Sequence, residues 1–131
     1  MDAALDDARY ISFGSRRRDG TLVATPTWVV AFDGGYAFTT SPTTHKVARI
    51  RRDPSVVVAP CDVRGRVRDD AVRLDATARV LDDGAVAEVQ RLVRAKYPVG
   101  WLLTVAPRRA LDRLRGRPRI GDCAIGITLE R

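Results

Sequence analysis

The sequence predicts an α+β fold built on an antiparallel barrel of about six strands with peripheral helices. Short apolar runs with strict alternation recur along the chain, separated by turn signals, which is typical of strands. Two of these signals, Asp19-Gly20 and Asp33-Gly34-Gly35, indicate hairpin turns between consecutive strands. Helical patterns are too few to lie between every pair of strands, as a parallel sheet would require. The strands are therefore expected to be antiparallel.

Local patterns place the elements along the chain. Strands are expected over residues 10–15, 22–32, 36–40, 55–61, 71–81 and 123–129. Helices are expected over residues 3–9, 46–53, 83–97 and 101–114. In the run 71–81, Val72, Leu74 and Ala76 belong to the set expected to face inward.

The run 22–32 is largely apolar on both faces, so both faces are expected to be covered. Pro26 lies within it, and a proline donates no ladder hydrogen bond. Its position is therefore expected to be a bulge, a sheet edge, or a place where something other than a strand lies alongside.

Size and composition indicate one globular domain over residues 1–131, since 45% of the residues are hydrophobic and 30% are charged. No apolar stretch approaches the roughly 20 residues of a membrane span, and the N-terminus is acidic where a signal peptide would be basic. We therefore expect a soluble, cytoplasmic protein. Cys61 and Cys123 lack metal-ligand spacing and are expected to be reduced, buried thiols.

The formal net charge of +7 favours an anionic partner: a nucleic acid, a membrane surface or a phosphorylated small molecule. Six arginines lie between Arg108 and Arg119, against Asp112 alone. A solvated basic face is the simpler interpretation, and the excess of arginine over lysine is also consistent with a compositional bias. A nucleic-acid binder ranks last because the cluster lacks interleaved aromatic residues.

A hydroxyl-rich segment that ends at Lys46 is the strongest candidate site. Free amides at a helix start, hydroxyl groups and a lysine together favour a bound anion. Helical spacing places Lys46 and Arg49 on one face, with Arg52 beyond them. An ordinary capped and solvated helix is an equally good interpretation of this segment alone. The hydroxyls are supplied by Thr39, Thr40, Ser41, Thr43 and Thr44.

Five segments together carry a resemblance to a known family. They are Arg18-Asp19-Gly20-Thr21, Thr25-Pro26-Thr27-Trp28, the run from Lys46 to Pro54, the run from Ala59 to Gly65, and Arg94-Ala95-Lys96-Tyr97. In order and spacing the chain resembles the F420-dependent (deazaflavin) branch of the pyridoxamine 5'-phosphate oxidase-like flavoproteins, which have the FMN-binding split β-barrel fold. The resemblance spans most of the chain.

The resemblance implies a homodimer with coenzyme F420, or alternatively FMN, in grooves between the protomers. It places the cofactor phosphate near Thr39, Thr40, Ser41 and Lys46, within the segment that contains Val47, with Arg49 as a second cation. It places the backbone of Thr25, Pro26 and Thr27 against the tricyclic ring. Arg64 would reach the cofactor tail or a neighbouring protomer, or form a structural ion pair. His45 and Ala48 differ from the residues that many relatives have at these positions. The difference bears on the affinity for the cofactor tail more than on the fold.

The function implied by this resemblance is hydride transfer between F420 and a small organic substrate. Such chemistry belongs to the cofactor and needs no catalytic side chain, and a single histidine, His45, excludes a histidine-based metal cluster. The alternatives are an FMN-binding oxidoreductase, a non-catalytic F420 carrier, and a basic nucleic-acid-binding protein.

Overall fold

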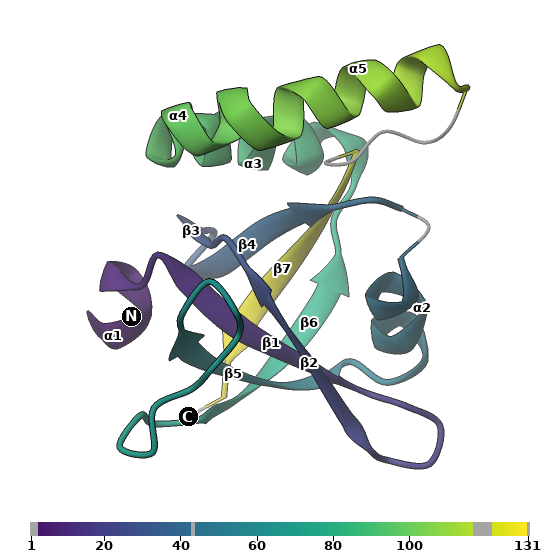
Figure 1. The fold of residues 1–131 in the computed structure, drawn as a ribbon. Helices are drawn as coiled ribbons and strands as arrows, with labels where there is room; N and C mark the ends of the chain where they lie inside the picture. Colours follow the sequence, from purple (N-terminus) through teal and green to yellow (C-terminus); the bar gives the residue numbers. More distant parts are fainter. Residues whose placement is uncertain (1–2, 43, 117–121, 131) are drawn as a thin grey trace.

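The computed structural model describes residues 3–42, 44–116 and 122–130. The described strands are β1 (Tyr10–Arg16), β2 (Leu22–Thr27), β3 (Val30–Phe32), β4 (Gly35–Thr40), β5 (Ser55–Cys61), β6 (Leu74–Val80) and β7 (Cys123–Leu129). The described helices are α1 (Ala3–Asp7), α2 (His45–Arg52), α3 (Asp83–Lys96), α4 (Pro98–Gly100), the π-helical η1 (Trp101–Val105) and α5 (Ala106–Leu114). The curled sheet lies beneath a layer formed by α3, α4 and α5, while α2 lies beside the barrel (Figure 1).

The seven strands form one antiparallel sheet in the order β2-β1-β5-β6-β7-β4-β3. Its two edge strands, β2 and β3, are consecutive in the chain and are joined through Trp28 and Val29. The chain itself therefore connects the two edges, where a closed barrel would have a ladder of hydrogen bonds. This arrangement confirms the predicted α+β fold and antiparallel split barrel.

The single strand predicted over residues 22–32 is wrong, because the segment forms two strands at opposite edges of the sheet. The apolar pattern does not show that the chain must leave one edge at Trp28 to reach the other. Pro26 does lie in an edge strand, opposite Ser12, which is the part of a sheet where proline is tolerated. Both faces of this segment were expected to be covered, but the outer face of β2 is open to solvent, since Leu22 is 40% exposed.

Two apolar clusters hold the layers together. The barrel interior contains Phe13 and Phe38, whose rings meet edge to face with centroids 4.8 Å apart. The second cluster joins the outer face of the sheet, through Ala37 and Ala124, to buried valines of α3. Alternation along β4 thus directs Phe38 into the barrel and Ala37 toward the helical layer.

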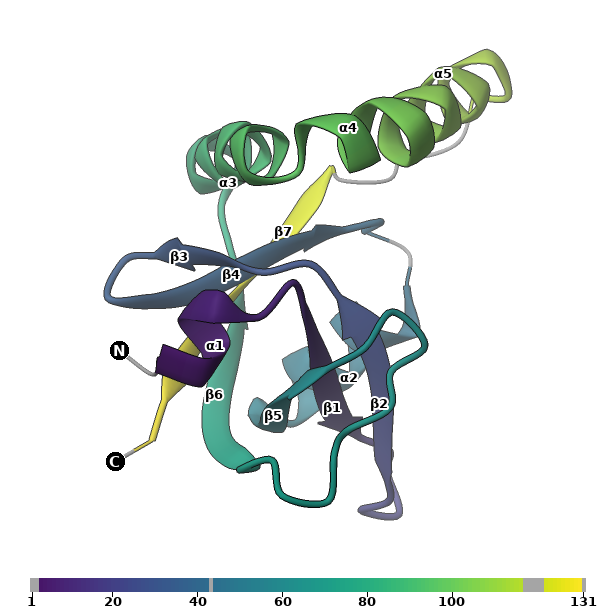
Figure 2. The same cartoon turned by 60° about the vertical axis from the view of Figure 1, so that its left-hand side comes forward.

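The helical layer is tied to the barrel at Tyr97, where α3 ends with φ −124° and ψ 57°. The Tyr97 hydroxyl donates to the Arg9 carbonyl at 2.8 Å, and its ring stacks on Trp28 with centroids 4.8 Å apart. From Pro98 the chain continues through α4 and η1 into α5, so this helical arm begins three residues before the predicted residue 101. Figure 2 shows α3 and α5 as separate rods above the sheet.

The predicted strand over residues 71–81 is shorter in the structure. β6 begins at Leu74, and Val72, expected to face inward, is 65% exposed. Pairing explains the difference, since the ladder with β5 begins where Leu74 meets Val58. Alternation alone does not show where a strand loses its neighbour.

Candidate functional site

The start of α2 leaves its backbone amides open to an anion. Thr44 is the N-cap residue, yet its hydroxyl caps no amide and instead donates to the Ser41 carbonyl at 3.1 Å. The hydroxyl oxygens of Thr40 and Thr44 lie 3.4 Å apart, and the first turn contains no acidic residue. Free amides at a helix N-terminus attract negative charge. Thr43, part of the predicted segment, lies outside the described residues.

Lys46 is a half-buried cation at this helix start. Its ammonium nitrogen lies over the ring of Phe38, 5.6 Å from the ring centroid. Burial, and then the nearby charge of Arg49, lower the pKa of Lys46. Within the described part of the chain no carboxylate pairs with this ammonium. A bound anion would offset the cost of burying the charge.

Arg49 extends the basic surface along α2. Its Nε donates to the Ser15 hydroxyl at 2.7 Å. Burial lowers the pKa of the Arg49 guanidinium, with further contributions from the like charges of Arg17 and Arg52. The groove here has a volume of about 410 Å³ and is lined by Arg17, Arg18, His45, Ala48, Arg49 and Arg52. None of these lining residues is acidic, so the groove is suited to a polyanion.

Thr25 contributes an unsatisfied polar atom to the edge strand β2. It pairs with Phe13 across the β1–β2 ladder, and its Oγ1 is the buried side-chain oxygen without a hydrogen-bond partner among the described residues. The hydroxyl of Thr27, two residues on, donates to the Trp28 carbonyl at 3.3 Å. A buried polar group without a partner is costly, which makes Thr25 Oγ1 a candidate contact for a bound molecule.

The two regions singled out in the sequence are connected through the barrel interior. Phe38 carries Lys46 over its ring and meets Phe13 edge-on, and Phe13 lies opposite Thr25 in the ladder. Phe13 and Phe38 are buried, so this connection is made by core packing between the two regions. Among the described residues Thr25 Oγ1 has no hydrogen-bond partner and the Lys46 ammonium has no carboxylate partner, and both groups fit a cofactor with a ring at β2 and a phosphate at α2.

Thr39 and Thr40 do not act on the same side of β4. Thr40 has the strand parity of Phe38 and approaches Thr44, whereas Thr39 has the parity of Ala37 and lines a cavity under the helical layer. A single phosphate at α2 would therefore meet the Thr40 hydroxyl but not that of Thr39. Val47 packs in the barrel core at 2% exposure, so only its backbone remains available to a ligand.

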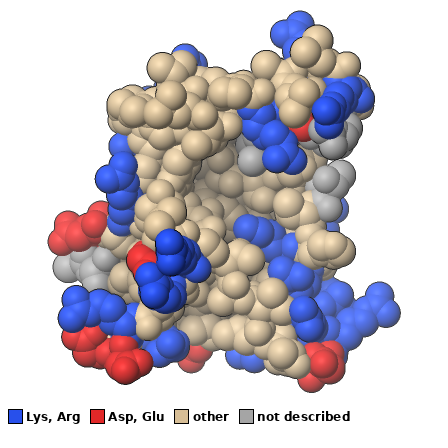
Figure 3. Space-filling model, in the orientation of Figure 1, with Lys and Arg blue, Asp and Glu red and all other residues tan. Residues whose placement is uncertain are grey.

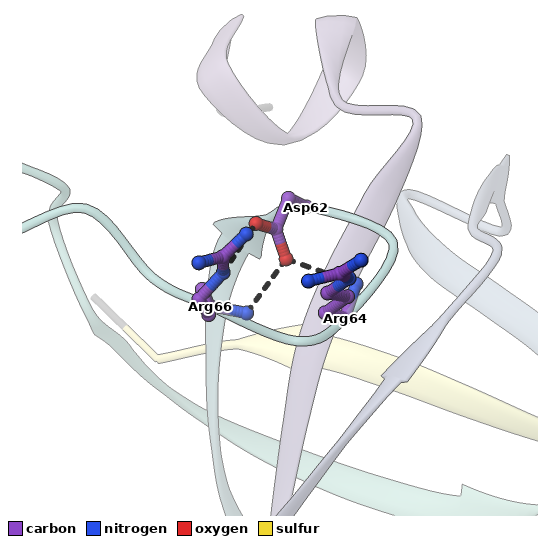
Figure 4. Close-up of polar contacts among 3 residues, drawn as sticks. All are labelled: Asp62, Arg64 and Arg66. Carbon is purple, nitrogen blue, oxygen red and sulfur yellow. Dashed lines mark hydrogen bonds and ion pairs between the residues drawn. The ribbon is translucent and has the colours of Figure 1, made fainter.

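The loop after β5 distinguishes Arg64 from Arg66. The Asp62 carboxylate accepts bonds from both backbone N–H groups and forms an ion pair with the Arg66 side chain at 3.0 Å (Figure 4). A structural ion pair was one of the roles expected for Arg64, and in the structure Arg66 forms that ion pair instead. The loop lies against the edge strand, since a Cβ on Gly65 would be 3.1 Å from Pro26 Cδ. Arg64 is therefore carried beside Pro26 on an exposed loop.

Sequence reasoning missed the contribution of Arg17 and Arg18 to the basic groove. The signal was the run Arg16-Arg17-Arg18 directly before the Asp19-Gly20 turn, but its proximity to α2 depends on the packing of β1 against that helix. The Arg49 to Ser15 bond spans 34 residues and fixes this proximity.

The arginine cluster at residues 108–119 is partly neutralised. Arg108 pairs with the buried Asp112 at 3.4 Å, and Arg109 pairs with Asp122 at 2.9 Å. Arg117 and Arg119 lie outside the described residues. The two pairs favour a structural role for Arg108 and Arg109 over a free basic face.

Cysteine and histidine form no metal site. The described residues contain no group of three or more potential ligands from histidine, cysteine and acidic residues. Cys123 is buried, as expected, whereas Cys61 is only partly buried, and both thiols are free. Burial, and then Asp62, raise the pKa of Cys61 to about 11, so it is not an activated thiol. His45 is exposed, in line with a solvated position at the helix start.

Figure 3 shows a hollow between the helical layer and the barrel, with Lys and Arg side chains on both sides of it. A family model described as pyridoxamine 5'-phosphate oxidase matches residues 1–119. The chain belongs to the pyridoxamine 5'-phosphate oxidase family. Cofactors of this family are of the flavin type, and its members include oxidoreductases.

Solved structures share the fold of this pyridoxamine 5'-phosphate oxidase family member at low sequence identity. The conserved hypothetical protein Rv2991 from Mycobacterium tuberculosis has a TM-score of 0.69 and 19% identity, over 100% of this chain and 82% of that one. HutZ, the heme storage protein from Vibrio cholerae, has a TM-score of 0.63 and 11% identity, over 97% and 85%. A protein named F420 reductase has a TM-score of 0.58 and 17% identity, over 98% and 92%.

No curated protein matches the sequence. The described helices of this family member are each too short or too polar to cross a bilayer.

Proposed function

We propose that this protein binds the deazaflavin F420 and transfers a hydride between it and a small organic substrate. The observation that carries the proposal is the Lys46 ammonium, half-buried over Phe38 without a carboxylate partner among the described residues. It lies at the uncapped start of α2, where a phosphate group would find both a cation and free amides.

The basic groove favours F420 over FMN. FMN ends at its phosphate, whereas the tail of F420 carries further carboxylates. Beside the helix that contains Lys46, the groove lined by Arg17, Arg18, Arg49 and Arg52 has no acidic lining residue. Such a surface suits an extended polyanion and exceeds what one phosphate needs. The structural neighbour named F420 reductase is consistent with this choice.

A homodimer forms part of the proposal. The helical arm exposes large apolar side chains that a single protomer does not cover, among them Leu102 at 64%, Leu103 at 70% and Leu114 at 85%. The edge strand β2 ends the sheet beside the proposed ring site. A second protomer that covers the arm and the edge would bury this apolar surface and close the site to water. The free thiols support placing the dimer in the cytoplasm.

In this mechanism the bound deazaflavin supplies the hydride chemistry. Lys46, Thr40 and the amides at the start of α2 would hold the phosphate. Thr25 Oγ1 would hydrogen-bond the ring system, and the β2 backbone would fix its orientation. The protein would thus position the cofactor and exclude water, and no side chain need act as an acid or base.

A titration of the purified protein with F420 and, separately, with FMN tests the proposal. We expect tighter binding of F420, and Lys46→Ala should weaken it at least tenfold through loss of a charge-assisted contact. Arg113→Ala, which changes an exposed arginine of α5, is the matched control and should bind as the wild type does. Preference for FMN would establish the flavin alternative, and binding to DNA without cofactor affinity would refute the proposal.

A further inference from the structure

A second cavity lies under the helical layer, away from α2. It has a volume of about 400 Å³, within the range of small-molecule sites, and lies between α3 and the η1–α5 arm. Its lining includes Gln90, Arg91, Arg94, Trp101, Val105 and Arg109. Apart from Arg91 and Arg94 on exposed turns of α3, these side chains are at least partly buried.

The cavity combines positive charge with an aromatic wall. The Arg94 guanidinium lies over the Trp101 ring, with Cζ 4.2 Å from the ring centroid. Among the described residues no carboxylate pairs with Arg94, and no acidic residue lines the cavity. Arg91 has only a long contact of 3.9 Å to the exposed Glu88. The Arg94 guanidinium thus remains available to a ligand, and the Arg91 guanidinium is held only weakly by Glu88.

Arg109 lies in the wall of the same cavity, where its charge is already paired. It pairs with Asp122 at 2.9 Å, which fixes its position and offsets its charge. The rest of the wall combines the apolar Val93, Val105 and the indole of Trp101 with the polar Thr39 and Gln90. A ligand that fits these groups has a flat apolar body and a single anionic group.

We propose that this cavity is a binding site for a small aromatic carboxylate, with the carboxylate on Arg94 and the ring against Trp101. The site is separate from the proposed cofactor site. Thr39 lines the cavity, whereas Thr40, with the opposite strand parity, approaches the start of α2. β4 therefore divides the two sites, and the binding of an aromatic acid does not depend on the use of F420.

Calorimetric titration with 2-naphthoate tests the site, with the neutral 2-naphthalenemethanol as the ligand control. We expect naphthoate to bind and the alcohol to bind at least tenfold more weakly. Arg94→Gln should weaken naphthoate about tenfold, since it removes the charge but keeps a polar side chain. Arg113→Gln, on the exposed surface of α5, should leave binding unchanged.

Two further variants separate this proposal from the cofactor site. Lys46→Ala should leave naphthoate binding unchanged, whereas Trp101→Leu, which removes the aromatic wall, should weaken both ligands. Thermal unfolding of each variant confirms that it is folded. Equal affinity for the acid and the alcohol, or naphthoate binding that survives Arg94→Gln and fails in Lys46→Ala, would overturn the proposal. Neither of these two results would bear on the proposal that the protein binds F420.

Discussion

The ammonium of Lys46, at the start of α2, lies 5.6 Å from the centroid of the Phe38 ring. The ring attracts the cation, yet burial still lowers the pKa of Lys46. Phe38 in turn packs against Phe13, so the charge is held on a rigid support. Such a cation is positioned before the ligand arrives, which reduces the entropic cost of binding.

The direction of this pKa shift predicts how anion binding varies with pH. Binding needs the charged ammonium, and Lys46 loses its proton below the ordinary value of 10.5. Affinity for F420 should therefore fall as pH rises through a range below 10.5, earlier than for an ordinary lysine. The free protein should respond with the opposite sign: its unfolding free energy should rise over the same range, because loss of the proton removes a buried charge.

Titrations with F420 across this pH range measure the effect, and Lys46→Arg is the control. Arginine keeps its charge throughout, so the variant should show a flat profile. A wild-type profile as flat as that of Lys46→Arg would show that Lys46 does not bind the anion.

Local patterns were sufficient for much of the fold. β5 and β7 have the predicted bounds, since both are continuous apolar or alternating runs bounded by turn residues. The antiparallel topology followed from the short hairpin turns. The division of residues 22–32 into β2 and β3 was not predictable, because both segments are apolar and only the closure of the barrel separates them.

The candidate site was predictable in its residue types but not in its geometry. The hydroxyls and cations near α2 were evident in the sequence, but Thr39 and Thr40 were expected near the same phosphate, and in the structure they lie on opposite faces of β4. Which face meets α2 depends on β4 pairing with β7, more than 80 residues further along the chain. Likewise, Arg17 joins the groove only because β1 packs beside α2.

Gly65 should tolerate no side chain, because of its conformation and because of Pro26. Its φ is +84°, and an added Cβ would lie 3.1 Å from Pro26 Cδ. Gly65→Ala should lower the unfolding free energy by about 2–3 kcal/mol, the sum of a left-handed backbone cost and local crowding. Gly20→Ala is the matched control: its φ is +86°, and nothing lies within 4 Å of the added Cβ. Urea unfolding should show a smaller loss for Gly20→Ala, and equal losses would show that the loop yields at Pro26.

Tyr97→Phe should weaken the joint between the helical layer and the barrel. The buried hydroxyl donates to the Arg9 carbonyl at 2.8 Å and accepts from the Val29 amide at 3.4 Å. Its removal leaves these groups without this partner and should cost about 1–3 kcal/mol in thermal or urea unfolding. Tyr10→Phe, in a partly exposed position of β1, should be close to neutral. A similar loss in both variants would contradict this role of the Tyr97 hydroxyl.

Thr25 and Thr27 allow the same substitution to be compared on one strand. Thr25 Oγ1 is buried without a partner among the described residues, whereas the Thr27 hydroxyl donates to the Trp28 carbonyl. Thr25→Val should therefore raise the unfolding free energy of the free protein by about 1 kcal/mol, because valine has the same shape and no polar atom. Thr27→Val should leave stability equal or lower. If Thr25 Oγ1 contacts the cofactor, Thr25→Val should also weaken F420 binding several-fold, so that stability and affinity change in opposite directions. Thermal unfolding and F420 titration of both variants measure these effects, and a Thr25→Val protein that is destabilised would show that the hydroxyl is satisfied within the free chain.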